Sequence, residues 1–98
     1  MTPTDIEHAV ERYLAKPYPI VLIPDDGEWI VAIPDLRGCI SQGATVAEAM
    51  EMIRDAQRAW LTVSLQNGAH IPEPSAPATI WTMHRPASVR EAHASVAG

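Results

Sequence analysis

The stretch from Trp29 to Glu48, WIVAIPDLRGCISQGATVAE, constrains the fold of this chain more than any other. Its first residues are apolar and β-branched, which predicts a strand, and Pro34–Gly38 then supplies turn residues. Cys39–Ser41 is expected to form a short third strand, which a glycine two residues later breaks. Thr45 stands at a helix N-cap position, and Glu48 can reach back to the backbone N–H of Thr45, as in a capping box.

Two helices are predicted. The first spans Asp5–Ala15, with a second capping-box match in Thr4 and Glu7 at its start. The second spans about Val46–Gln66, where apolar residues recur at helical spacing, and Asn67-Gly68 ends it as a C-cap would.

Strands are predicted on either side of a turn at Asp25–Gly27, over Tyr18–Ile23 and Glu28–Ile33. Both are apolar at nearly every position, which predicts a sheet covered on both faces or one whose second face meets a partner. Beyond a proline-rich link, Ala78–Met83 is a candidate fourth strand. The fold class is therefore α+β: an N-terminal helix, a three-stranded antiparallel sheet and a long helix packed on that sheet.

The order of these pieces resembles the HicB family, the antitoxins of HicA/HicB toxin–antitoxin pairs. The resemblance rests on the P-D-L-x-G-C and G-x-T strings, on YPIVLI with PDDGE upstream, and on the NG and IPEP strings downstream; it covers about residues 13–83. It implies a partial ribonuclease-H-like fold over residues 18–83, after an N-terminal helix (1–17) and before a short C-terminal tail (84–98). The positions that carry the structural motif are Trp29, Pro34, Asp35, Gly38, Cys39, Gly43, Thr45, Glu48, Trp60 and Gly68.

The resemblance also implies a function: neutralisation of a small basic HicA-type toxin, an mRNA-cleaving ribonuclease, by covering its active site. The acidic balance suits such a partner, since twelve acidic residues against seven Lys and Arg give a net charge of −5. Trp81 is expected either in the core or as a partner anchor. The residues predicted to bind the partner are Asp25, Asp26, Glu28, Asp35, Glu51, Asp55 and Trp81.

Two other functions compete with this one. The chain is alternatively an orphan HicB-like homo-oligomeric binding module without a toxin, in which Thr79–Met83 pairs across a two-fold axis and buries Trp81. The third hypothesis is a small cation-dependent nuclease that depends on Asp25 or Asp35. It is the weakest, because turn formation explains these aspartates and the first predicted strand contains no acid.

No catalytic, cofactor-binding or metal-binding residue is predicted, so the chain is not expected to be an enzyme. His8, His70, His84 and His93 show no ligand spacing with one another or with Cys39. The lone cysteine and the absence of a signal-peptide pattern or long apolar run predict a cytoplasmic protein without a membrane span. Direct DNA binding is not expected, because no basic stripe is present and the 24 residues after Pro74 are too few for a complete DNA-binding domain.

Overall fold

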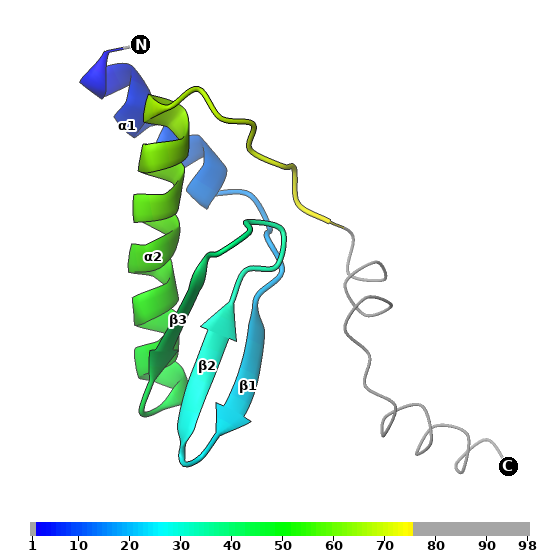
Figure 1. Cartoon of the computed structure of the whole chain (residues 1–98). Coiled ribbons are helices and arrows are strands. Elements are labelled where there is room, and N and C mark those ends of the chain that lie inside the picture. Colours follow the sequence, from blue (N-terminus) through cyan, green and yellow to red (C-terminus); the bar gives the residue numbers. More distant parts are fainter. Residues whose placement is uncertain (1, 76–98) are drawn as a thin grey trace, which may run out of the picture.

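A computed structural model describes residues 2–75 and contains two helices and three strands in the order α-β-β-β-α (Figure 1). The elements are α1 (Pro3–Leu14), β1 (Val21–Asp25), β2 (Glu28–Ala32), β3 (Ile40–Gly43) and α2 (Val46–Gln66). The strands form one antiparallel sheet in the order β1-β2-β3, α2 packs against β2 and β3, and α1 packs against α2. The predicted α+β arrangement is confirmed. The candidate fourth strand lies outside the described residues.

Helix α1 begins earlier than predicted. Its N-cap is Thr2, whose side chain accepts a hydrogen bond from the Asp5 amide, while the Asp5 carboxylate accepts one from the Thr2 amide. The capping box is therefore Thr2 with Asp5, and the predicted box of Thr4 with Glu7 is wrong. The reason is Pro3, which lacks an N–H and has a fixed φ, and so fits the first helical position. These hydrogen bonds to Thr2 also lower the pKa of Asp5.

The strands differ from the predicted ranges at their ends. β1 runs over Val21–Asp25 rather than Tyr18–Ile23 and contains Pro24, which an edge strand tolerates because no ladder partner needs its missing N–H. β3 runs over Ile40–Gly43 rather than Cys39–Ser41. The amide of Cys39 donates to the Leu36 carbonyl at 2.9 Å, so Cys39 still belongs to the preceding turn.

Gly43 ends the third strand instead of breaking it, since it pairs with Trp29 of β2. A Cβ atom at this position would lie 2.4 Å from the backbone nitrogen and 2.8 Å from the Cα atom of Ala49. Only glycine allows α2 to approach β3 this closely. Gly43 therefore has a structural role, as predicted, but the reason is the close contact between β3 and α2 and not the breaking of a strand.

The bounds of α2 agree with the prediction, and Thr45 is its N-cap, accepting a hydrogen bond from the Glu48 amide at 3.1 Å. The Glu48 carboxylate, however, accepts from the amide of Ala44 at 3.2 Å rather than from Thr45 as predicted. The C-cap is Asn67, and Gly68 follows with φ +66°, a conformation that favours glycine.

The core lies between the sheet, α2 and α1. Its largest fully buried side chains come from β2, from the turn after it and from α2: Val31, Ile33, Leu36, Ile53 and Leu61. Val10 of α1 is 2% exposed and belongs to the same cluster. The predicted domain boundary at residue 17 stays a prediction, although α1 contributes to this shared core.

Candidate functional site

The face of the sheet that turns away from α2 is the candidate functional site, and we call it the outer sheet face. Successive side chains of a strand point to opposite faces, and Val31 of β2 is fully buried against α2. The register therefore places the neighbours of Val31, and the residues paired with those neighbours, on the other side. The apolar residues of the outer sheet face are Val21, Ile23, Ile30, Ala32 and Ile40.

This face is open to solvent in the described part of the chain. The side chain of Ile23 is 51% exposed and that of Ile40 is 61% exposed. Within residues 2–75, α2 packs only on the opposite side of the sheet and α1 packs against α2. The sequence left open whether the second face is covered or meets a partner, and for these residues the structure favours a partner.

Acidic residues lie at one end of the outer sheet face. Asp25 and Glu28 pair with each other at the β1–β2 hairpin and share the face of Ile23 and Ile30. Asp26, with φ +50°, forms the turn between them. All three are exposed. Three of the predicted partner-binding residues therefore lie together beside an apolar surface.

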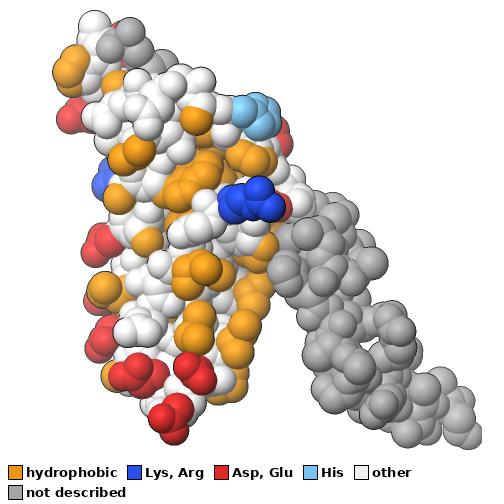
Figure 2. Space-filling model, viewed as in Figure 1, with side chains coloured by type: hydrophobic (Ala, Val, Ile, Leu, Met, Phe, Trp, Pro, Cys, Tyr) orange, Lys and Arg blue, Asp and Glu red, His pale blue; other side chains and the backbone are white. Residues whose placement is uncertain are grey.

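Helix α2 brings further acids to the same end of the molecule. It begins just after Gly43, which pairs with Trp29 next to the hairpin, so its first turns lie near that hairpin. Figure 2 shows acidic side chains gathered at this end and hydrophobic side chains over the strands. Glu51 is exposed near the start of α2, and Asp55 is exposed one turn farther along. The predicted acidic residues other than Asp35 thus lie on the hairpin or on this helix.

Asp35 lies at the opposite end of the sheet, in the connection between β2 and β3, and its carboxylate is already engaged. One oxygen accepts a hydrogen bond from the Ser75 amide at 2.8 Å, and the other accepts one from the Ser75 hydroxyl. Asp35 thus holds the segment that follows α2 against the sheet. Its part in partner binding stays a prediction, and Trp81 lies outside the described residues.

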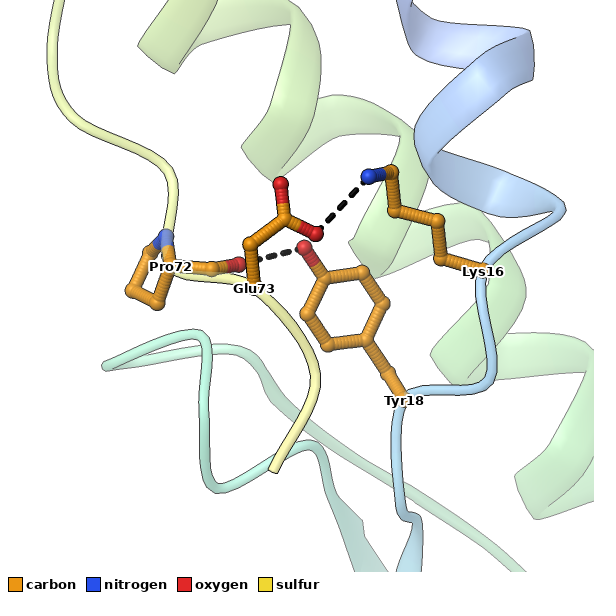
Figure 3. A network of polar contacts seen from close by, with 4 residues as sticks. All are labelled: Lys16, Tyr18, Pro72 and Glu73. Atoms are coloured by element: carbon orange, nitrogen blue, oxygen red, sulfur yellow. Dashed lines mark hydrogen bonds and ion pairs between the residues drawn. The ribbon is translucent and has the colours of Figure 1, made fainter. Parts of the chain in front are cut away.

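A second set of contacts holds the same segment, and sequence reasoning missed it (Figure 3). The Tyr18 hydroxyl donates to the Pro72 carbonyl, and Lys16 pairs with Glu73 at 2.7 Å. Burial, with a smaller contribution from the Glu73 carboxylate, raises the pKa of Tyr18 to about 12. Ile71, 6% exposed, inserts into the core beside them. These contacts fix the position of residues 71–75, the segment after α2, and their role is structural.

The other residues of the sequence motif have structural surroundings. The Trp60 indole N–H donates to the Arg37 carbonyl at 2.8 Å, and Trp29 and Trp60 both pack half-buried against the core. Gly38 has φ +85°, which the turn before β3 requires. Cys39 is buried, and its burial raises the pKa of the thiol, so the reactive thiolate is disfavoured.

The described histidines do not form a metal site. His8 lines a groove of about 640 Å³ between α1 and α2, beside the exposed ion pair of Arg58 and Glu11 at 2.6 Å, whereas His70 is exposed after α2. Within residues 2–75, no three His, Cys, Asp or Glu side chains are grouped so that they could hold a metal ion. Nor is any helix in that range both long and apolar enough to cross a membrane.

Comparison with known proteins gives one family. The family described as HicB_like antitoxin of bacterial toxin-antitoxin system matches residues 18–88. The chain is 35% identical over 60 residues to UPF0150 protein Ta0767 of Thermoplasma acidophilum. This alignment covers 60% of this chain and 87% of that protein. It is 34% identical over 56 residues to UPF0150 protein ssl0259 of Synechocystis, covering 56% and 77% of the two chains.

A longer relative is also found. The chain is 37% identical over 59 residues to Antitoxin HicB of Escherichia coli K12, an alignment that covers 59% of this chain and 43% of the antitoxin. No solved structure matches the chain. The likeness to a partial ribonuclease H fold therefore stays a prediction from the sequence.

Proposed function

This chain belongs to the HicB-like antitoxin family of bacterial toxin–antitoxin systems, and from that membership we propose that it neutralises a HicA-type, mRNA-cleaving toxin in the cytoplasm by covering the toxin's active site. The observation that supports the proposal most directly is the outer sheet face, an exposed apolar surface with an acidic end. The toxin would pack on the apolar strands and direct basic residues toward the hairpin. The antitoxin's role is to bind, and it performs no catalysis.

The charge of the chain suits this partner. Residues 1–74 hold eleven acidic residues and five Lys and Arg, a net charge of −6. A ribonuclease must neutralise RNA phosphates, so its substrate-binding surface carries basic residues. An acidic protein is steered toward such a surface and competes there with RNA. The isoleucines of the outer sheet face would then supply affinity through burial of apolar area, at about 25 cal/mol per Å².

Co-purification tests the proposal first. The protein is co-expressed with the product of the adjacent open reading frame, and that product is also expressed alone in a growth assay. We expect a stable complex, growth arrest by the neighbour alone, and rescue by this protein. A neighbour that neither binds nor arrests growth would refute the toxin assignment and leave the alternative, an orphan homo-oligomeric binding module.

Two variants test the surface. Ile23→Glu puts a charge on the outer sheet face, where Ile23 is 51% exposed, and we expect it to weaken toxin binding by about tenfold or more. Val63→Glu is the matched control, because Val63 is 54% exposed but lies on α2. The affinity of each variant for the toxin is measured by titration calorimetry, and its ability to restore growth is measured in the rescue assay. Equal affinity of the two variants would show that the toxin binds elsewhere.

A further inference from the structure

The outer sheet face is lowest at Ala32. The register pairs Ala32 with Val21 of β1 on one side and with Ile40 of β3 on the other, so a methyl group stands between two branched side chains. Ile40 is 61% exposed and rises above the sheet, whereas Ala32 is half-buried. The core of a stable interface is packed as densely as a protein interior, so a partner that covers this face must fill the low point with a large side chain.

The acidic side chains of the face lie at a fixed distance from this low point. Glu28 is four positions before Ala32 on β2, and Asp25 of β1 is the residue paired with Glu28. A strand rises about 3.3 Å per residue, so the acidic pair lies about 13 Å from the low point. Ile30 lies halfway between them, paired with Ile23. The face is therefore apolar at one end and in the middle, and negatively charged at the other end.

We propose that this face receives one amphipathic α-helix of the toxin, which lies along β2 with a large apolar side chain on Ala32 and a Lys or Arg beside Asp25 and Glu28. The inference rests on the proposed function and names the element of the toxin that binds. A helix rises about 1.5 Å per residue, so about 13 Å corresponds to eight or nine residues. One face of a helix presents positions i, i+4, i+7 and i+8. The toxin helix should therefore carry apolar residues at i and i+4 and a basic residue at i+7 or i+8, in either chain direction.

The width of the face favours a helix over a strand or a second sheet. Three strands about 4.8 Å apart place the outer two about 10 Å from each other, which is the diameter of one helix with its side chains. A single strand laid on apolar side chains would leave its own N–H and C=O groups without partners, whereas a helix bonds these groups internally. A second sheet needs a wider apolar surface, but the row of Ile23 and Ile30 ends at the polar Gln42 on β3.

Charge fixes which end of the helix lies at the hairpin. Asp25 and Glu28 are exposed, and within residues 2–75 neither enters an ion pair, so both can bind a cation. The row of Val21, Ala32 and Ile40 is uncharged. A basic side chain placed over that row would lose its hydration without gaining an ionic partner. The basic residue of the helix is therefore expected over the hairpin, and the large apolar residue over the uncharged row.

Ala32→Leu tests the low point, because a flat face and a filled low point predict opposite results. On a flat face, leucine adds apolar area and leaves the complex as tight or tighter. If the toxin already places a large side chain on Ala32, the leucine overlaps with it, and the affinity measured by titration calorimetry should fall about tenfold. Ala47→Leu is the matched control, because Ala47 is exposed on α2, and it should leave the affinity unchanged. Circular dichroism confirms that both variants fold.

Double-mutant cycles test the helix. The toxin used is the product of the adjacent open reading frame. Each of its large apolar residues and each Lys or Arg is changed to alanine and measured against the unchanged chain, Ala32→Leu and Glu28→Gln. We expect one apolar residue coupled to Ala32 and one basic residue coupled to Glu28, about seven or eight positions apart in the toxin sequence. A separation of about four positions would indicate a strand, which rises as β2 does, and would overturn the proposal.

The helix proposal and the proposed function fail in different ways. If the neighbouring product does not bind the unchanged chain, the toxin assignment fails, and the helix proposal fails with it. If that product binds and Ile23→Glu does not weaken it, the toxin lies elsewhere and the helix proposal is overturned. If Ile23→Glu weakens binding but Ala32→Leu does not, the outer sheet face is the toxin site, and only the helix proposal is overturned.

Discussion

Gly43→Ala tests the contact on which the sheet–helix packing depends. The added methyl carbon would lie 2.4 Å from the nitrogen and 2.8 Å from the Cα of Ala49, and 2.9 Å from the carbonyl carbon of Glu48. All three are backbone atoms of α2, so no side-chain rotation relieves the overlap. The start of α2 must move away from β3, which loosens the packing of Ala49, a fully buried residue.

The size of the effect follows from two opposing terms. Overpacking of a tightly packed core costs about 1–3 kcal/mol, and an overlap with rigid backbone belongs at the upper end of that range. Replacing glycine restricts the unfolded chain and returns about 0.4–1 kcal/mol. With the first term at about 3 kcal/mol, we therefore expect a net loss of about 2–2.6 kcal/mol. That is a large share of the total for a domain of this size, at about 0.05–0.15 kcal/mol per residue.

Urea unfolding measures this loss, with thermal unfolding as a second readout. A destabilisation of about 2–2.6 kcal/mol lowers the melting temperature by about 10 °C or more. The control is Gly68→Ala: unlike Gly43, Gly68 has a left-handed backbone, with φ +66°, but nothing lies within 4 Å of the added carbon, so the change should cost only about 1 kcal/mol. A Gly43→Ala protein as stable as the control would refute the close approach of strand and helix.

Two further predictions concern the segment after α2. In a Tyr13→Phe protein, ultraviolet titration should find the Tyr18 phenol with a pKa of about 12. Because the unfolded chain loses this proton near pH 10, stability should be complete below that pH and fall as the pH rises toward 12; a stability curve flat to pH 12 would contradict this. Ser75→Ala removes one of two hydrogen bonds to Asp35 and should cost about 1 kcal/mol in urea unfolding, whereas no loss would show that the amide alone suffices.

Local signals predicted α2 well and α1 less well, for a physical reason. A helix end depends on a few neighbouring residues, and Thr45 with Gly68 marks the two ends of α2 without ambiguity. At the start of α1, Thr2 with Asp5 and Thr4 with Glu7 both have the spacing of a capping box, and only the second pair was predicted to form one. Pro3 decides between them, because its ring favours the first helical position and so selects Thr2 as the cap.

The contacts of Asp35 and Tyr18 were beyond prediction from local patterns. Asp35 follows a proline in a predicted turn, where hydrogen bonds to the next amides are reason enough for an aspartate. In the structure, however, its carboxylate accepts hydrogen bonds from Ser75, forty positions away. The sequence predicts that Tyr18 is part of a strand, but its hydroxyl donates a hydrogen bond to the Pro72 carbonyl, fifty-four positions away. Such pairs depend on where the segment after α2 runs, and that path is a property of the packed structure.

The apolar composition of β1 and β2 left two interpretations open, and the register separates them. One face is buried on α2, while the outer sheet face, with Ile23 and Ile30, is not covered within residues 2–75. The alternation of residues could not decide this, because β1 and β2 are apolar at positions of both faces, and only the packing of α2 shows which face is covered. A partner on the outer sheet face would therefore bury Ile23 and Ile40 without disturbing the contact between the sheet and α2.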